Sequence, residues 1–300
     1  MNGMELARDL YESRLRPAIA EQFPEEQARI AVGLAGPGSE CFGFDDAISR
    51  DHDFAPRACL WLTDEDDARF GARLQTLYAS IAPQSGIAPQ ARDRSGVMRI
   101  SAFYARFTGC PGVPQTPIGW LCIPEHLLAA ATNGSVFRDD LGAFSAIRSG
   151  LLRGYPEDVF RKRLAARLFA AGQAGQYNLP RCRDRSDPVA ASFCLTAFAQ
   201  ASLQIVFLLN RRYAPYDKWL FRAACALPAC RDAVSDVRRL ISCLRDEQPE
   251  LIERIAFRIT EELRRQQLSS ESNPFLVAQA AAVSAGIQSP ELRALELSVG

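Results

Sequence analysis

Apolar and polar positions follow two different periods along the first third of the chain. Residues 5–23 carry apolar side chains at intervals of three and four, which predicts an amphipathic helix that ends before Pro24. The segment 29–35 is short and apolar, with β-branched residues at Ile30 and Val32. The sequence Gly-Pro-Gly-Ser at 36–39 ends this apolar run. This pattern predicts a buried strand followed by a sharp turn.

Two further apolar runs predict a second strand at 54–62 and a third at 97–103. Between them, residues 64–81 have helical spacing, and either Thr63 or Asp64 is predicted to cap the N-terminus of this helix. The segment 82–94 contains proline, glycine and serine, which predicts a loop.

From Pro124 onward the pattern is helical almost throughout. Asp187-Pro188 has the form of a helix cap with proline at the first helical position. The apolar run that follows, 192–209, is interrupted by threonine and glutamine, which favours a buried helix over a membrane span. Further helices are predicted at 215–227, 231–246, 249–267, 274–285 and 290–297.

These elements predict an α+β chain with two domains. Residues 1–115 would form a mixed β-sheet with flanking helices, and residues 116–300 an all-helical C-terminal domain. The boundary is placed at the shift in composition near 111–124, which begins with the loop 111–117 and its three prolines and one glycine.

Composition narrows the classes of function. Lys+Arg and Asp+Glu are both 35, so the chain lacks the basic excess of a nonspecific nucleic-acid binder. Charges are spread through the first fifteen residues, which is unlike a signal peptide, and we expect a cytoplasmic protein without membrane partners. Nine scattered cysteines without a C-x-x-C spacing predict reduced thiols, and two histidines exclude a multi-histidine metal site.

The segment GSECFGFDDAISRDHDF at 38–54 is the strongest candidate for chemistry. In a strand, residues two apart face the same side, so Asp51 and Asp53 would present paired carboxylates. Carboxylate oxygens suit Mg²⁺, which keeps room for substrate phosphates. Gly38 and Ser39, in a turn that opens a helix, would offer backbone N–H groups and a hydroxyl to those phosphates. The alternative is that the two aspartates cap a turn and the Gly-Ser pair is an ordinary loop.

This arrangement, Gly-Ser followed about a dozen residues later by Asp-x-Asp between strands, resembles the DNA polymerase beta-like nucleotidyltransferase superfamily. The phrases TNGSVFRDD, GLLRGYPEDV, GQYNLPRCRDR and NRRYAPYDKW resemble a bacterial branch of it that is mostly labelled as a domain of unknown function. The resemblance implies that Asp51 and Asp53 are catalytic and bind Mg²⁺ or Mn²⁺. It also implies that Gly38 and Ser39 contact the nucleotide.

The function implied is Mg²⁺-dependent transfer of a nucleoside monophosphate from a nucleoside triphosphate such as ATP to an acceptor hydroxyl. Neutral net charge favours a small molecule or a protein over a long nucleic acid as acceptor.

Active members of the superfamily usually supply a third carboxylate from a later strand, and this sequence departs from that pattern. The strand 97–103 offers Arg99 and Ser101, and no acid, at its alternating positions. A degenerate, regulatory nucleotide-binding protein is therefore the alternative function. Asp93 is near this strand but lies in the predicted loop 82–94. Acids of the helical half that could substitute are Asp139, Asp140, Glu157 and Asp158. Asp45 and Asp46 could bind a second cation, but a capping role is favoured.

The helical half offers a second set of candidate ligands. Arg181, Arg211 and Lys218 could hold the phosphates, and Tyr213 could stack on the base. The alternative is that the aromatic residues fill the core and the basic ones are solvated. The basic run 161–163 with Arg167 favours a solvated helix face.

Overall fold

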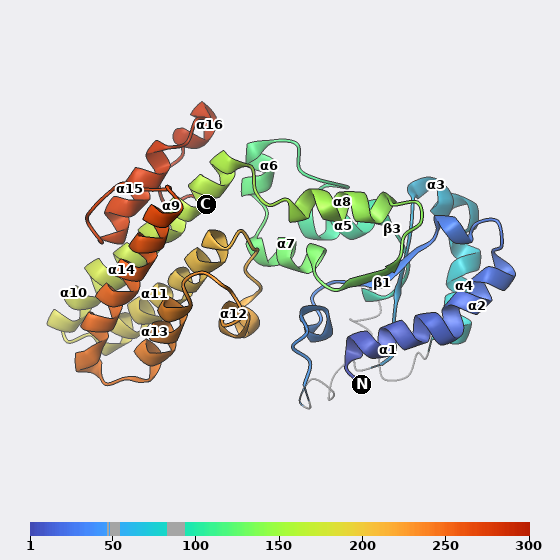
Figure 1. Cartoon of the computed structure of the whole chain (residues 1–300), viewed down its shortest axis with the longest axis horizontal. Helices are drawn as coiled ribbons and strands as arrows, with labels where there is room; N and C mark the ends of the chain where they lie inside the picture. Colours follow the sequence, from blue (N-terminus) through green and yellow to red (C-terminus); the bar gives the residue numbers. More distant parts are fainter. Residues whose placement is uncertain (47, 49–54, 83–93) are drawn as a thin grey trace. The chain divides into compact units, whose positions relative to one another are not determined.

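The structure is a computed structural model, and it describes residues 1–46, 48, 55–82 and 94–300. Packing divides the chain into two compact units. Unit 1 comprises Met1–Pro114 and Leu127–Arg153, and unit 2 comprises Gln115–His126 and Gly154–Gly300. The chain is α+β, with a small mixed sheet and many helices (Figure 1).

The described strands form one sheet in unit 1, in the order β3-β2-β1-β4. They are β1 (Ala31–Leu34), β2 (Cys59–Leu62), β3 (Gly96–Arg99) and β4 (Ser135–Arg138). β1 runs antiparallel to β2 and β4, whereas β2 and β3 are parallel. Because β4 pairs with β1, the segment Leu127–Arg153 belongs to unit 1 although it follows the predicted boundary at 115/116.

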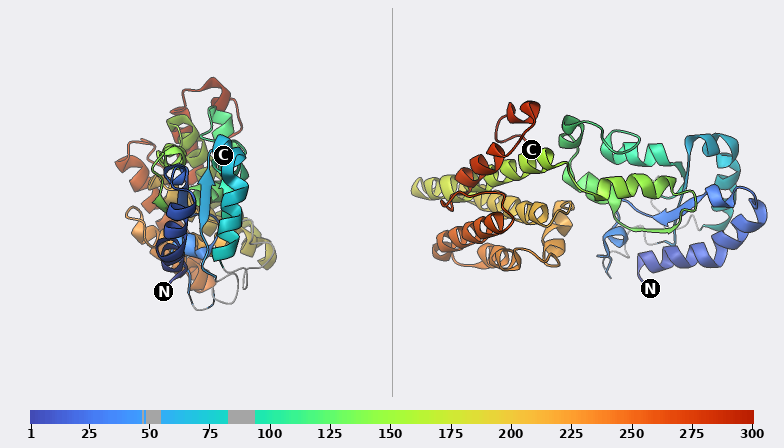
Figure 2. Two further views of the ribbon diagram at one scale, coloured as in Figure 1. Left: turned by 90° about the vertical axis from the view of Figure 1, so that its right-hand side faces the viewer. Right: turned by 45° about the horizontal axis from the view of Figure 1, so that its top comes forward.

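Helices cover both faces of the sheet. One face carries α1 (Gly3–Leu10), the π-helical turn η1 (Tyr11–Leu15), α2 (Arg16–Gln22), α3 (Asp64–Asp66), the π-helical turn η5 (Asp67–Gly71) and α4 (Ala72–Ile81). Figure 2 shows α1 and α2 beside α4 on this face. The other face carries α5 (Ile100–Thr108) and α8 (Ala143–Leu152), side by side in Figure 1.

Strand alternation explains the two faces. Leu60 and Leu62 pack in the core under α1 and α4, whereas Trp61 points the other way and stacks on Phe144 of α8 at 3.8 Å between ring centroids. The predicted helix 5–23 is confirmed as α1, η1 and α2 in succession. Thr63 caps α3 as predicted, because its hydroxyl accepts the Asp66 N–H at 3.1 Å.

The prediction of a strand through 97–103 is wrong beyond Arg99. Helix α5 begins at Ile100 and buries Ile100, Phe103, Tyr104 and Phe107 at helical spacing. Residues 100–103 suit either structure by their pattern of apolar and polar side chains. The sequence alone therefore does not show where β3 ends and α5 begins. The expectation of helix almost throughout after Pro124 is also wrong at β4, which contains only four residues.

Unit 2 is helical in its described residues, and its longest helix is α11 (Pro188–Leu209). Asp187 caps this helix as predicted. Its carboxylate accepts the Val189 and Ala190 N–H groups at 3.1 and 3.0 Å. The first helix of unit 2 is α6 (Pro117–Leu121). Helix α7 (Glu125–Thr132) has its first two residues in unit 2 and the rest in unit 1. The others are α9 (Glu157–Ala171), the π-helical η7 (Gly172–Asn178), α10 (Leu179–Asp184), α12 (Asp217–Ala224), α13 (Arg231–Ser242), η8 (Arg245–Glu247), α14 (Gln248–Arg265), α15 (Leu276–Ala285) and α16 (Pro290–Arg293).

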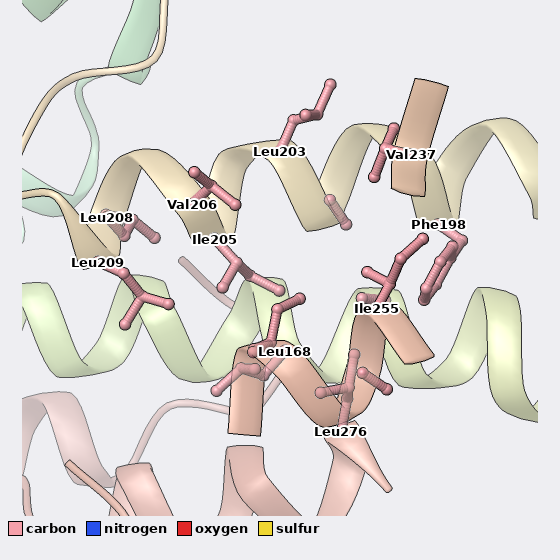
Figure 3. Packing of buried hydrophobic residues seen from close by; sticks show 14 of the residues in the cluster. Leu168, Phe198, Leu203, Ile205, Val206, Leu208, Leu209, Val237, Ile255 and Leu276 are labelled. Carbon is pink, nitrogen blue, oxygen red and sulfur yellow. The ribbon is translucent and has the colours of Figure 1, made fainter. Parts of the chain in front are cut away.

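Helix α11 is long and apolar enough to cross a membrane by length and composition. In unit 2 its apolar side chains between Phe198 and Leu209 pack in the core. Figure 3 shows Phe198 and Ile205 of this helix facing Ile255 of α14 and Leu168 of α9. The predicted buried helix is therefore confirmed over this part of α11.

The expectation that the basic run 161–163 forms a solvated face is wrong for two of its residues. Lys162 is 1% exposed and donates to the Leu295 and Glu296 carbonyls at 2.8 and 2.7 Å, and Arg163 is 3% exposed. Helix α9 is buried on several sides, because α11 and α15 both pack against it. A helix in this position does not need one polar and one apolar face, and its sequence does not show them.

Candidate functional site

The turn 36–39 and the segment 55–58, which lie on either side of the candidate motif's aspartates in the sequence, are found at one end of the sheet in unit 1. Gly33 of β1 faces Cys59 of the antiparallel β2, and Cys59 faces Gly96 of the parallel β3. The C-terminal end of β1 therefore lies beside the N-terminal ends of β2 and β3. The turn 36–39 leaves β1 at this end, and residues 55–58 enter β2 there.

Asn133 fixes the backbone of the turn. Its side chain accepts the Gly36 N–H at 2.9 Å and donates to the Gly36 carbonyl at 2.7 Å. Gly36 has φ +132°, a conformation that favours glycine. The next residue, Gly134, donates its N–H to the Cys41 carbonyl at 2.9 Å. No local pattern predicts this role, because Asn-Gly-Ser at 133–135 is also a common turn sequence.

Charged side chains hold the segment after the turn. Glu40 pairs with Arg57, and both side chains are largely buried. Asp45 accepts the Gly3 N–H at the start of α1 at 2.6 Å, and Asp46 accepts the Ile48 N–H at 3.1 Å. The favoured prediction is that one aspartate of this pair caps the helix or turn leading to the strand at 54–62. Asp46 makes a local turn contact of this kind with Ile48, whereas Asp45 holds the start of α1 instead.

Gly38 and Ser39 lie at the start of a single 3₁₀ turn, η3 (Ser39–Phe42), and not of a longer helix. A four-residue turn has only a small dipole, so the expected support of a helix N-terminus is weaker than the sequence suggested. Asp51 and Asp53 lie outside the described residues, as does Asp93.

A cavity of about 250 Å³ opens at the same end of the sheet. Most of its wall is apolar and includes Pro37, Met98, Phe103 and Phe107. Two arginines, Arg94 and Arg106, also line it. The position of this cavity follows from the register, because Pro37 follows β1 and Arg94 precedes β3.

The acids suggested as a third metal ligand have other partners. Asp139 is held by the Ser145 N–H, Asp140 by Arg138, Glu157 by Arg161 and Arg211, and Asp158 by the Gln288 and Ser289 N–H groups. Over the described part of the chain, no three side chains of His, Cys, Asp or Glu form a group that could hold a metal. Arg99 lies 3.9 Å from Asp64, and Ser101 donates to the same carboxylate at 2.5 Å.

The candidate ligands of the helical half have separate surroundings in unit 2. Arg181 on α10 lies over the ring of Tyr177, with 3.9 Å from the guanidinium carbon to the ring centre. Arg211 pairs with Glu157 at 3.0 Å and lies over the ring of Phe160.

Lys218 of α12 lies 5.0 Å from the ring centre of Trp219. Tyr213 packs edge-on against Tyr155, with 5.1 Å between ring centres. Burial raises the pKa of Tyr213. The side chain is half-buried among aromatic neighbours, which agrees with the alternative that the aromatic residues pack inside the domain.

Residues 120–220 match the model of a family described as a domain of unknown function (DUF4037). The matched span runs from α6, through both units, to α12. No curated protein matches the chain.

Proposed function

We propose that the chain is a nucleotidyltransferase that moves a nucleoside monophosphate from a nucleoside triphosphate to an acceptor hydroxyl. The observation that carries the proposal is the register of β1, β2 and β3. It gathers the Gly-Ser turn, the approach to β2 and the arginine-bearing cavity at one end of the sheet. In a nucleoside triphosphate, backbone N–H groups and cations bind the phosphates, and an apolar wall holds the base.

The cavity supports the nucleotide part of the proposal. Met98, Phe103 and Phe107 offer an apolar surface to a base, and Arg94 and Arg106 offer guanidinium groups to phosphate oxygens. The turn is fixed by Asn133 before any ligand arrives, so its ordering adds little to the cost of binding.

The donor set suits a hard divalent cation. Asp51 and Asp53 are two carboxylates separated by one residue, and Mg²⁺ or Mn²⁺ takes oxygen ligands of this kind. When bound, the cation would neutralise charge on the phosphates during displacement of pyrophosphate. We propose a small molecule or a protein as acceptor, because the net charge of zero offers no general attraction for long nucleic acids.

A second candidate is a protein that binds the nucleotide without transferring it. The arrangement of β3 favours this candidate, because the strand ends at Arg99 and Ser101 is already bonded to Asp64. Without a third carboxylate the metal would be held less firmly, and transfer would suffer more than binding.

Thermal unfolding of the full chain with ATP, GTP, CTP or UTP, each with and without Mg²⁺, tests the site. A ligand that binds the folded state raises its stability by mass action. We expect a Mg²⁺-dependent shift with at least one nucleotide, and its loss in the variant Asp51→Asn, Asp53→Asn. The control Asp9→Asn, Glu21→Gln changes the charge equally at exposed positions of α1 and α2 and should keep the shift.

The same proteins incubated with α-labelled nucleotide separate the two candidates. Release of labelled product with pyrophosphate supports transfer, whereas a shift without turnover supports binding alone. If folded protein shows no shift with any nucleotide, or if the control variant loses the shift as well, the proposal is wrong.

A further inference from the structure

A buried polar cluster lies within unit 2, separate from the nucleotide site proposed in unit 1. It consists of Glu125 at the start of α7, Arg163 and Arg167 on α9, Tyr155, and Tyr213. Glu125 is 7% exposed, and Arg163 is 3% exposed. Charged side chains reach this degree of burial only rarely unless they are paired.

Several polar atoms of the cluster lack hydrogen bonds within the described residues. They are both carboxylate oxygens of Glu125, the hydroxyl of Tyr155 and the Nε of Arg163, and all are shielded from solvent. The Ala214 N–H lies close to the Glu125 carboxylate, but the contact lacks the geometry of a hydrogen bond. A buried acceptor without a donor costs stability, so four such atoms in one place need an explanation.

The surroundings hold the cluster in a fixed arrangement. One terminal nitrogen of Arg163 donates to the carbonyls of Trp120, Leu121 and Ile123 at 3.2, 2.9 and 2.5 Å. The Arg163 guanidinium also lies over the ring of Tyr155, 4.8 Å from its centre, and Tyr155 packs edge-on against Trp120. Side chains locked in this way are suited to bind a ligand without further ordering.

A cavity of about 410 Å³ borders the cluster. Glu125, Arg163 and Arg167 line it, together with the polar residues His126, Gln204 and Tyr216. This volume lies in the range of pockets that bind small molecules.

The chemistry of the lining restricts the ligand. Glu125 needs hydrogen-bond donors, whereas Arg163 and Arg167 need acceptors. An ammonium group beside Glu125 would face two guanidinium groups, and an anion beside Arg167 would face the carboxylate. A hydroxyl group donates and accepts at once and has no charge, so adjacent hydroxyls meet both demands.

We propose that this cavity binds an uncharged polyhydroxylated small molecule of the sugar or cyclitol class, with hydroxyls that donate to Glu125 and accept from Arg167. This proposal does not depend on the nucleotide site.

Calorimetric titration of the full chain tests the proposal with D-glucose, D-xylose, sorbitol, myo-inositol and trehalose as uncharged probes. Glucosamine, gluconate and glucose 6-phosphate vary the charge on one scaffold. We expect at least one uncharged probe to bind at concentrations up to about 20 mM, and a charged probe to bind more weakly than its uncharged parent.

Glu125→Gln and Arg167→Met should each weaken binding about tenfold or more, because each removes hydrogen bonds to a charged partner. Glu250→Gln and Arg185→Met make the same chemical changes at exposed positions of unit 2 and should leave affinity unchanged. The proposal is overturned if no uncharged probe binds, if a charged probe binds more tightly than glucose, or if neither cluster variant weakens binding.

Discussion

Replacing Glu125 by glutamine should stabilise unit 2 by an amount that grows with pH. Burial raises the pKa of Glu125 from 4.5 to about 7, and the Ala214 N–H, Arg163 and Arg167 only partly oppose this effect. The difference is roughly 2.5 pH units, and at 1.36 kcal/mol per unit ionised Glu125 costs the folded state about 3 kcal/mol.

The sign of the pH dependence follows from proton binding. Between pH 4.5 and about 7 the folded protein holds a proton on Glu125 that the unfolded chain has released. The contribution of Glu125 to stability therefore falls as pH rises through this window, and it is constant above it. Glutamine does not titrate, so the variant should gain about 2–3 kcal/mol relative to the wild type between pH 5 and pH 8.

Urea unfolding followed by tryptophan fluorescence measures this difference. Trp120 packs against Tyr155, so one of the three tryptophans reports on the cluster directly. All other titrating groups are common to the two proteins and cancel in the difference to first order. Glu250→Gln, at a side chain that is 83% exposed, should give a difference that does not change with pH. A difference for Glu125→Gln that is also flat from pH 5 to pH 8 would refute the reasoning.

Three further predictions concern other contacts. Lys162→Met leaves the Leu295 and Glu296 carbonyls without their donor, so unit 2 should lose about 1–3 kcal/mol in urea unfolding and residues near 295 should become sensitive to proteases. Asn133→Asp removes the donor to the Gly36 carbonyl, and the nucleotide-induced thermal shift should fall while the fold, checked by circular dichroism, persists. Asp187→Ala removes the cap of α11 and should cost about 1 kcal/mol in the same urea assay.

Local signals were sufficient where a few consecutive residues determine the structure. The strand before Gly36 could be predicted because an apolar run meets a Gly-Pro-Gly-Ser break, and the caps at Thr63 and Asp187 need only neighbouring N–H groups. β4 could not be predicted in the same way. Its four residues form a strand because β1 offers a free edge about a hundred positions earlier, and no local pattern carries that information.

The same distinction separates the two candidate sites. Asp51-x-Asp53 and Gly38-Ser39 are close in the sequence, so a motif could suggest them, although the clamp from Asn133 is visible only in the fold. The cluster around Glu125 has members from four separate segments, and each segment is ordinary by itself.

One feature of α9 could have drawn attention to that cluster. Arg163 and Arg167 stand among Leu164, Ala165, Ala166 and Leu168, so no turn of this helix presents a purely polar face. An arginine that cannot reach solvent from such a helix needs acceptors inside the protein, and Arg163 finds three carbonyls at the end of α6. Because a terminal nitrogen of Arg163 is directed to those carbonyls, it does not pair with Glu125. Within the described residues, the Nε of Arg163 and both carboxylate oxygens of Glu125 have no hydrogen-bond partner. A purely structural role for this cluster would leave the Glu125 carboxylate unpaired, whereas a ligand with hydroxyls that donate to Glu125 would pair it.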